Sequence, residues 1–575
     1  MFPIDFFFRA AQRYPDRIAL ESPTSSVSYA SLARQVRALA AGLQAIDPAP
    51  QSRVGICAGN SANHILALLA VLAAGKVWVP LNYRSTITEI GRILDATEPT
   101  ILFADATGKP LLQAGAAVIV SLDDDTAQAG GSAAGNKADS GAANQAAANQ
   151  VAAHKGTANQ GDANQGAAHQ GVANQGAANN GDNGKGLAQA TTSGGPGPSL
   201  AALLRAHDGQ SPAACALTRD DTQAIKFTGG TTGLPKGVMQ PYRAWNAGII
   251  NQINGWRLTE ADRYVVAAPV THGTSTYLLP ILAQGGTHVL LDSVSPETIT
   301  QAFRERGGTL AFMPPTLIYM IMAQPGITRA DFPALRNLIY GGAPMPADKI
   351  DEVQTFFGPV VGTTYGQTEA PQIVTVLPPG ELAEPSNRGS VGRTTWLSDM
   401  AIMSPDGTLL PAGELGEVVV KGDLVMSGYW RLPEKTAETI VAGWLHTGDV
   451  GLVDDRGYLY LKDRIRDVVI TGGFNVYPVD VENALSLHPA VYESTVFGVP
   501  DPKWGEAVHA AVQLHAGKTV TPEVLMAHVR ERLGPVQTPK QVHFYDSLPR
   551  SSVGKVLKTA VRQDALAASA TTTLS

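Results

Sequence analysis

The chain has 575 residues, which is long for a single hydrophobic core and indicates two or more domains. Its 43 Lys and Arg residues against 50 Asp and Glu residues give a formal net charge of −7, without the basic surplus typical of nucleic-acid-binding proteins. Cys57 and Cys215 have neither metal-ligand nor disulfide spacing, which favours a reducing compartment, so we expect a cytoplasmic protein.

The N-terminal stretch MFPIDFFFRAAQRYPD carries Asp5 early and lacks both a basic first segment and a small-residue cleavage pattern. It therefore does not predict a signal peptide. The longest apolar run, ILALLAVLAAG from Ile65, is too short to cross a bilayer. We expect a buried helix there and no membrane span.

Short apolar runs alternate with helical patterns along much of the chain. The first part of this pattern predicts strands at 53–57, 77–81 and 101–105 and helices at 62–75 and 89–99. After residue 220 it predicts strands at 223–227, 263–269, 309–315 and 335–342 and a helix at 295–308 that ends in glycine. Such alternation is typical of parallel sheets, so the expected fold class is α/β.

The pattern changes beyond residue 400, where runs such as 416–422 and 457–463 are separated by turn residues. These runs predict an antiparallel, β-barrel-like subdomain attached to a large N-terminal domain of stacked α/β sheets. The last hundred residues predict a small α+β domain. Within it, Thr521 is the expected N-cap and Gly534 the end of a helix at 521–534.

A low-complexity segment at 122–198 interrupts the pattern and repeats with a period of five from Ala143. Pentapeptide-repeat β-helices share this period but need Leu or Phe at the centre, where this chain has Gln, Lys or Asn. Because no core can offset the entropy of ordering, we expect disorder. The segment is either a tolerated expansion of a surface loop or a tether that binds a partner.

The stretch TGGTTGLPKG at 228–237 follows the strand predicted at 223–227. Glycines let a backbone approach an anion closely, and consecutive N–H groups can surround it. A Walker loop has Ser or Thr directly after its lysine, whereas Lys236 lies between Pro235 and Gly237. From these residues alone, a phosphate-binding loop and a flexible Gly/Thr turn remain alternatives.

Further motifs follow in a fixed order. They are GGAPM at 341–345, YGQTEAP at 365–371, WLHTGDVG at 444–451, KDRIRDVVITGGFNVYPVDVE at 462–482 and LPRSSVGKVLK at 548–558. Together with 228–237, they resemble the adenylate-forming superfamily of acyl-CoA synthetases, peptide-synthetase adenylation domains and luciferase-like enzymes. The resemblance covers the chain except the repeat segment. It implies that a carboxylate attacks the α-phosphate of Mg·ATP, and that a thiol then takes the acyl group from acyl-AMP.

The resemblance also implies residue roles in nucleotide binding. Thr368 would donate to the α-phosphate, and Glu369 would bind Mg²⁺, with Thr228 as a second candidate near the metal. Tyr365 would stack on adenine, while Asp449 and Arg464 would reach the ribose. The remaining implied ATP-binding residues are Gly229, Gly230, Thr231, Thr232, Gly233 and Lys236 for the departing phosphates, Gly341, Gly342, Ala343 and Pro344 at the adenine, and Gly366 and Gln367.

By the same resemblance, residues 1–465 form the large domain and 466–575 a small, mobile domain, with Arg466 as the hinge. Relatives often carry Asp or Lys at the hinge, so the rate of rotation does not follow from the motif. Lys555 would contact the carboxylate and the α-phosphate during adenylation. After rotation, Gly472 and Gly473 would line the tunnel for a pantetheine arm.

His272 occupies the place where relatives keep a His or an aromatic residue beside the acyl carboxylate. Amino-acid-activating relatives have an Asp near this point, but here no acidic residue follows until Asp292. An ammonium group without a counter-charge would be costly, which disfavours amino acids as substrates. The apolar helices expected at 275–284 and 314–322 suggest a fatty or aromatic acid, although core packing explains their side chains equally well.

The resulting hypothesis is an AMP-forming acyl-CoA synthetase that uses ATP, Mg²⁺ and CoA and has a catalytic set of Lys555, Thr368, Glu369 and His272. One alternative is an acyl-AMP ligase that loads a phosphopantetheinyl carrier protein. A second, from another class, is a non-catalytic nucleotide-binding scaffold whose working surface is the repeat segment. A homodimer is possible, and no nucleic-acid partner is expected.

Overall fold

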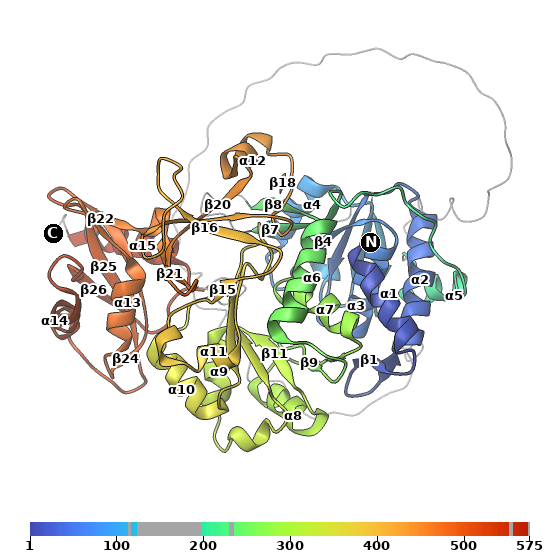
Figure 1. Cartoon of the computed structure of the whole chain (residues 1–575), viewed down its shortest axis with the longest axis horizontal. Helices are drawn as coiled ribbons and strands as arrows, with labels where there is room; N and C mark the ends of the chain where they lie inside the picture. The colour runs from blue at the N-terminus through green and yellow to red at the C-terminus, as the bar shows by residue number, and fades with distance from the viewer. Residues whose placement is uncertain (113–116, 124–196, 229–234, 551–555, 573–575) are drawn as a thin grey trace, which may run out of the picture. The chain divides into compact units, whose positions relative to one another are not determined.

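The computed structural model describes residues 1–112, 117–123, 197–228, 235–550 and 556–572, with side chains to residue 567. The disorder expected for the repeat segment, Lys555 and the middle of the 228–237 loop lie outside the described residues. Within those residues the chain forms four β-sheets with helices packed against them (Figure 1). The α/β class predicted from the sequence is confirmed.

The largest sheet has nine strands in the order β15-β14-β13-β12-β11-β9-β10-β1-β2. The strands are β1 (Ile18–Glu21), β2 (Ser26–Ser28), β9 (Arg263–Val265), β10 (Thr287–Val289), β11 (Leu310–Met313), β12 (Asn337–Tyr340), β13 (Val361–Tyr365), β14 (Thr375–Leu377) and β15 (Arg393–Thr394). The run from β1 to β13 is parallel, as expected, whereas β2, β14 and β15 add antiparallel edges. Tyr365 ends β13, so this sheet delivers the YGQTE motif to one strand end.

The second sheet has seven strands in the order β18-β8-β7-β4-β3-β5-β6. They are β3 (Arg53–Cys57), β4 (Val77–Leu81), β5 (Ile101–Ala104), β6 (Val118–Ser121), β7 (Thr222–Thr228), β8 (Lys236–Pro241) and β18 (Gly428–Tyr429). Strands β3 to β7 are parallel, but β8 turns back antiparallel on β7 and β18 on β8. Parallel strands therefore carry an antiparallel edge in this sheet too, which the simple alternation rule did not predict.

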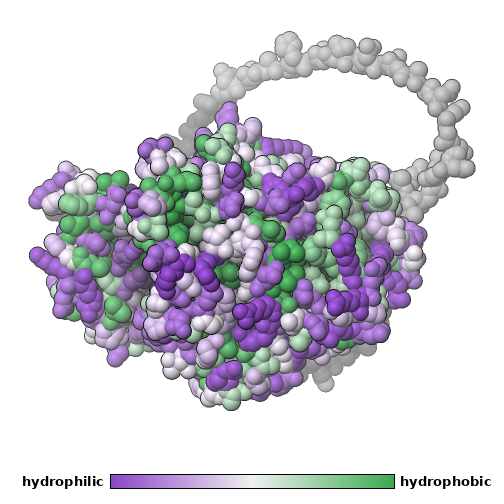
Figure 2. Space-filling model, viewed as in Figure 1, coloured by the Kyte–Doolittle hydropathy of each residue, from purple (hydrophilic) through white to green (hydrophobic). Residues whose placement is uncertain are grey.

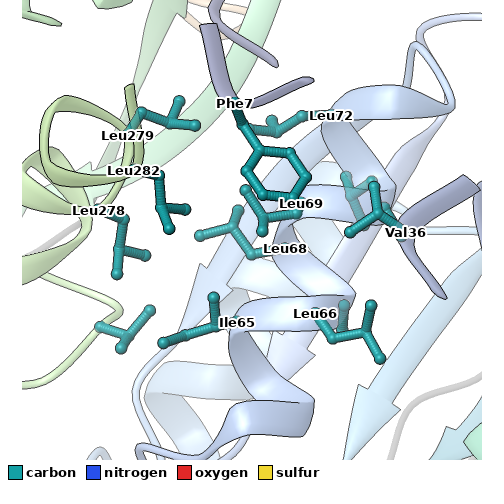
Figure 3. Packing of buried hydrophobic residues seen from close by; sticks show 14 of the residues in the cluster. Phe7, Val36, Ile65, Leu66, Leu68, Leu69, Leu72, Leu278, Leu279 and Leu282 are labelled. Carbon is teal, nitrogen blue, oxygen red and sulfur yellow. The ribbon is translucent and has the colours of Figure 1, made fainter. Parts of the chain in front are cut away.

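Helices bury their apolar faces between and against these two sheets. They are α1 (Pro3–Arg13), α2 (Tyr29–Ile46), α3 (Ala62–Ala73), α4 (Ile87–Thr97), α5 (Leu200–Ala206), α6 (Tyr242–Trp256), α7 (Thr274–Gln284), α8 (Pro296–Arg306), α9 (Pro315–Met322), α10 (Ala347–Phe357) and α11 (Pro379–Leu382). Helix α3 is buried on nearly all sides, as its composition predicts: Figure 3 shows its leucines packed against Phe7 and the leucines of α7. Helix α4 begins two residues before the prediction because the Thr86 side chain caps it by accepting a bond from Glu89 N.

The antiparallel region expected beyond residue 400 is present as a five-stranded sheet in the order β16-β17-β20-β19, with β21 also paired to β20. Its elements are β16 (Asp399–Met403), β17 (Gly416–Lys421), α12 (Pro433–Thr439), β19 (Ile440–Val441), β20 (Trp444–Val453) and β21 (Leu459–Arg464). In the register of this sheet, Asp449 on β20 lies opposite Arg464 on β21. The sheet thereby brings two of the predicted site motifs together.

The C-terminal residues form an α+β unit around a fourth sheet, in the order β23-β22-β25-β24 with β26 paired to β25. Its elements are β22 (Val469–Thr471), β23 (Phe474–Val476), α13 (Pro478–Ser486), β24 (Val491–Asp501), β25 (Gly505–Leu514), α14 (Pro522–Leu533), β26 (Gln541–Tyr545) and α15 (Lys558–Thr572). Thr521 is the N-cap of α14 as predicted, but its side chain makes no capping bond to the backbone. Gly534 ends the helix with φ +82°.

The ends of the repeat segment lie next to each other, because Ser121 and Ser199 form an isolated parallel bridge. Leu122 is buried beside it. Within the described ranges, no helix combines the length and apolarity that a bilayer crossing requires. Figure 2 shows hydrophilic residues, in purple, over much of the visible face, with smaller hydrophobic areas in green between them.

Candidate active site

The 228–237 stretch joins two antiparallel strands rather than a strand and a helix. Thr228 ends β7, Lys236 begins β8, and the two residues are direct partners in the ladder. Residues 229–234, which include Gly229, Gly230, Thr231, Thr232 and Gly233, lie outside the described residues. In a Walker loop the lysine lies at the start of a helix, whereas Lys236 lies at the start of a strand. This structural difference agrees with the difference between the 228–237 sequence and a Walker sequence.

Lys236 and Glu369 both contact the side chain of Tyr429. The Lys236 ammonium lies 5.1 Å from the centroid of the Tyr429 ring, and the Tyr429 hydroxyl donates a hydrogen bond of 2.9 Å to Glu369 Oε1. Strand β18 positions Tyr429, because it pairs with β8 next to the hairpin. The backbone also helps, since Met426 N donates to Glu369 O at 2.8 Å. The predicted phosphate-binding lysine and the predicted metal-binding carboxylate are therefore neighbours.

Tyr429 was missed by the sequence interpretation. The only signal for it was the short motif SGYW at 427–430, between YGQTEAP and WLHTGDVG. Burial, and next to it the Glu369 carboxylate, raise the pKa of Tyr429 above its ordinary value, so its hydroxyl stays a donor at neutral pH. A second missed residue is Gln240, whose amide donates to Thr368 O at 2.8 Å and fixes the backbone of the YGQTE motif.

Asp449 is the centre of a second cluster. The Tyr365 hydroxyl donates to Asp449 Oδ2 at 2.6 Å, and the Gln367 amide donates to the same oxygen. On the other side, Arg464 Nε forms an ion pair of 2.6 Å with Asp449 Oδ1. A carboxylate offers about four acceptor positions, so one remains for a ligand hydroxyl. Burial, together with the Asp449 charge, raises the pKa of Tyr365 well above its ordinary value.

The GGAPM segment follows β12 and turns sharply. Gly342 has φ +79°, which favours glycine, and a side chain at Gly341 would meet the Phe312 ring at 2.9 Å. Gly342 and Pro344 are exposed, while Ala343 is half-buried. The segment thus presents close backbone at the end of a parallel strand, where nucleotides bind in α/β folds. Gly366 is equally constrained, since a Cβ there would lie 2.5 Å from the Gln372 backbone.

His272 lies on the turn before α7, with an exposed side chain whose Nδ1 is 3.0 Å from Thr271 Oγ1. Behind this turn lies a buried lysine that the sequence interpretation did not single out. The Lys226 ammonium donates to Ser275 Oγ at 2.7 Å, and burial lowers the pKa of Lys226 to about 7. Only the position of Lys226, two residues before Thr228 in a strand otherwise apolar at its centre, hinted at it.

The predicted hinge and tunnel residues lie on the C-terminal side of β21. Arg466 is exposed within a short 3₁₀ turn, Ile465–Asp467, and its Nε is 3.6 Å from Asp467 Oδ1. Gly472 and Gly473 form the two-residue turn of the β22–β23 hairpin, with φ of +59° and +83°. Lys555 lies outside the described residues.

The donor set suits Mg²⁺ bound mainly through ATP. Glu369 supplies a carboxylate and Thr228 a hydroxyl, which are oxygen ligands of the kind this ion prefers. Across the part of the chain that the structure describes, no group of three or more His, Cys, Asp or Glu side chains could hold a metal ion alone. Mg²⁺ commonly binds through one or two carboxylates plus substrate phosphates, so the residues present fit a metal that arrives with the nucleotide.

Comparison with known protein families agrees with this geometry. Residues 7–430 match the AMP-binding enzyme family, and residues 480–555 match the AMP-binding enzyme C-terminal domain. The chain belongs to the AMP-binding enzyme family. Curated relatives of this chain include acid–thiol ligases, and this chain is an ATP-dependent enzyme of that class.

Among curated members of the AMP-binding family, a feruloyl-CoA synthase of Amycolatopsis is 33% identical over 563 residues, covering 96% of this chain and 97% of the relative. A fatty acid–[acyl-carrier-protein] ligase of Streptomyces coeruleorubidus is 28% identical and covers 96% of this chain and 94% of its own. Among solved structures, the amide bond synthetase McbA of Marinactinospora thermotolerans has a TM-score of 0.78 at 28% identity, covering 98% of this chain and 99% of its own.

Proposed function

We propose that this AMP-binding enzyme activates a fatty or aromatic carboxylic acid as acyl-AMP and transfers the acyl group to the thiol of CoA. A substrate carboxylate oxygen attacks the α-phosphorus of ATP, and the bond to the β-phosphate oxygen breaks to release pyrophosphate. The CoA sulfur then attacks the acyl carbon, its proton passes to solvent, and AMP leaves. The arrangement of Lys236, Tyr429 and Glu369 supports this assignment most directly.

In the first step, an anion approaches a polyanion, so repulsion must be offset by positioned cations and donors. Lys236 and the loop before it would hold the β- and γ-phosphates. Thr368 would donate to the α-phosphate, with its backbone fixed by Gln240. Glu369, aided by Thr228, would hold Mg²⁺, which when bound neutralises phosphate charge. Lys555 would contact the carboxylate and the α-phosphate.

The nucleoside would bind between the two motif clusters. Gly341, Gly342, Ala343 and Pro344 would border the adenine with close backbone. Asp449 would accept from a ribose hydroxyl through its remaining acceptor position, and the Arg464 ion pair would keep the carboxylate oriented. The Tyr365 hydroxyl is already committed to Asp449, so its ring face is the part left for stacking on the base.

The second step requires that the thiol reach the acyl carbon. We propose that the small domain, residues 466–575, rotates about Arg466 and withdraws Lys555. The Gly472–Gly473 turn would then border the pantetheine arm, because a thin chain can pass close to glycine backbone. His272, exposed on its turn, would lie at the junction between the acid and this path.

The identity of the acid is supported by the site and by the relatives. No acidic side chain follows His272 until Asp292, so an α-ammonium would lack a partner there. The relatives named above include a feruloyl-CoA synthase and a fatty-acid ligase, which favour an aromatic or aliphatic acid. The carrier-protein ligase among them keeps a carrier-bound pantetheine as the second candidate acceptor.

The test is a product assay on the purified full chain. ATP, Mg²⁺ and a panel of aliphatic and aromatic acids are incubated with CoA, with a phosphopantetheinylated carrier protein, or with neither. Formation of AMP and acyl-CoA in equal amounts supports the proposal. Acid-dependent exchange of pyrophosphate into ATP without consumption of CoA would support the carrier-loading alternative, and absence of exchange with every acid would reject adenylation altogether.

A further inference from the structure

Lys226 is a buried lysine that lies beside two aromatic rings. It lies on β7, two residues before Thr228, and only 8% of its surface is exposed. Its ammonium is 5.1 Å from the centroid of Trp78 on β4 and 5.3 Å from that of Trp245 on α6. The electron-rich faces of two indoles favour a positive charge at this point.

When protonated, Lys226 has no carboxylate partner among the residues that the structure describes. Its one hydrogen bond there is to Ser275 Oγ at 2.7 Å, although an ammonium has three donors. Burial of an ion without a counter-charge is costly, and cation–π contacts offset only part of that cost. An anionic oxygen of a bound ligand would supply the counter-charge that the described protein residues do not supply.

The position of Lys226 links it to both halves of the candidate site. Ser275 Oγ, which accepts from Lys226, donates in turn to His272 O at 2.6 Å. The ammonium is thus one side chain away from the turn that carries His272.

On the opposite side, two side chains separate Lys226 from the adenylation motif. Trp245 Nε1 donates to Gln240 Oε1 at 3.2 Å, and the Gln240 amide donates to Thr368 O at 2.8 Å. The reacting carboxylate must lie beside Thr368 and the α-phosphate. One indole and one amide therefore separate Lys226 from the place where the reacting carboxylate would lie.

We propose that the Lys226 ammonium binds a second oxygen group of the acid substrate, above all a second carboxylate, and makes the enzyme selective for acids that carry one. This inference rests on the proposed acid activation and names its substrate class more narrowly. A charge-assisted hydrogen bond in a buried site is stronger than a neutral one, so a carboxylate should be preferred to a carbonyl or hydroxyl oxygen at the same place.

The test compares acids that differ only at the end remote from the reacting carboxylate. On an aliphatic scaffold these are adipate, 6-oxoheptanoate, 6-hydroxyhexanoate and heptanoate. On an aromatic scaffold they are 3-(4-carboxyphenyl)propanoate and 3-(4-methylphenyl)propanoate. The readout is kcat/KM for acid-dependent pyrophosphate exchange, which does not depend on the thiol acceptor. The wild-type enzyme should favour the second carboxylate over methyl by about 10- to 100-fold on at least one scaffold.

Lys226→Met removes the charge but keeps an unbranched side chain of similar length. It should reverse the preference, by lowering kcat/KM for the diacid and raising it for the methyl-ended acid, with KM for ATP unchanged. Lys226→Arg should retain a preference for the second carboxylate. Lys349→Met, at a half-buried lysine paired with Glu352, is the matched control and should change neither ratio.

The outcomes separate this inference from the proposed function. If exchange occurs but the wild-type enzyme prefers the methyl-ended acid on both scaffolds, Lys226 is only a core cation and the inference is wrong. The same follows if Lys226→Met folds with an unchanged preference. If Lys226→Met does not fold, the inference is judged from the substrate preference of the wild-type enzyme alone. Absence of exchange with every acid would instead reject the proposed adenylation.

Discussion

The Tyr365 hydroxyl donates a hydrogen bond of 2.6 Å to Oδ2 of Asp449, a residue 84 positions later in the chain. Tyr365 ends a strand of the nine-stranded sheet and Asp449 lies in the five-stranded antiparallel sheet. Their contact, extended by the ion pair between Asp449 and Arg464, ties three sequence motifs into one cluster. The cluster fixes a carboxylate whose proposed task is to hold the ribose.

The first prediction follows from that cluster. Asp449→Asn should raise KM for ATP by about 10- to 100-fold, because the ion pair with Arg464 is lost and the ribose loses an anionic acceptor. Steady-state kinetics at saturating acid measures the change. Asp208→Asn, at an exposed carboxylate 3.9 Å from Arg34, is the control and should leave KM unaltered. An unchanged KM in Asp449→Asn would remove this residue from the nucleotide site.

Tyr429→Phe tests the link between Lys236 and Glu369. The variant keeps the ring beside Lys236 but loses the hydroxyl that orients Glu369. We expect the Mg²⁺ concentration for half-maximal activity to rise by about 3- to 10-fold, since one neutral-to-charged hydrogen bond is removed. The measurement is a Mg²⁺ titration of pyrophosphate exchange at fixed ATP.

A matched pair elsewhere in the chain controls for this variant. The Tyr458 hydroxyl donates to Glu381 Oε2 at 2.7 Å, away from the candidate site residues. Tyr458→Phe should leave the Mg²⁺ dependence as in the wild type. If both variants shift it equally, or neither does, Tyr429 does not act through Glu369.

The proposed role of Lys555 separates the two half-reactions. Lys555→Ala should slow adenylation by about 100- to 1,000-fold, because the charge that develops at the carboxylate and α-phosphate loses a positioned cation. Transfer from supplied acyl-AMP to CoA should stay within a few-fold of wild type, since the lysine is not needed after adenylation. Rapid-quench assays of each half-reaction decide, and an equal loss in both would contradict the assignment.

Two neighbouring histidines in the C-terminal unit predict that its stability falls in acid. His509 Nδ1 and His543 Nε2 lie 3.1 Å apart on β25 and β26, and burial, followed by the His543 charge, lowers the pKa of His509 to about 4. The unfolded chain binds its proton near pH 6.5, so stability is full above that pH and is lost as pH falls towards 4. The expected loss from His509 is on the order of 3 kcal/mol.

Thermal unfolding between pH 4 and 7.5 measures this loss. His509→Phe should flatten the acid side of the profile, because the group that must be protonated is gone. His515→Phe, at an exposed residue of the same domain, should leave the acid side of the profile unchanged. A wild-type unfolding temperature that stays constant down to pH 4 would show that the pair does not limit stability.

Deletion of residues 125–195 is expected to leave activity intact. Ser121 and Ser199, which flank the segment, already form a bridge, so a short linker can replace what lies between them. Specific activity and unfolding temperature of the shortened chain should match those of the full chain. A loss of active protein would support the alternative in which this segment has a task of its own.

The sequence predicted most of the elements and the motif order because periodicity and turn residues are local signals. Strands 53–57 and 77–81 and the buried helix after Ala62 are confirmed nearly residue for residue. The edge strand β18 could not be predicted, since the pairing of Tyr429 with Val238 joins segments far apart in the chain. For the same reason the contact of Tyr429 with Glu369 was invisible, although Glu369 itself was named.

The burial of Lys226 could not be predicted from the sequence for a different reason. In the sequence it is one lysine among apolar neighbours, and nothing local says whether its side chain reaches solvent. Its burial follows from Trp78 and Trp245, which approach from another strand and a helix. A cation enclosed in this way depends on tertiary packing, which motif recognition does not report.

The proposed reaction is tested best by the product balance of the purified full chain with ATP, Mg²⁺, CoA and an accepted acid. We expect one AMP, one pyrophosphate and one acyl-CoA for each ATP consumed, with acyl-AMP accumulating when CoA is omitted. Formation of ADP and phosphate, or consumption of ATP that does not depend on the acid, would contradict it.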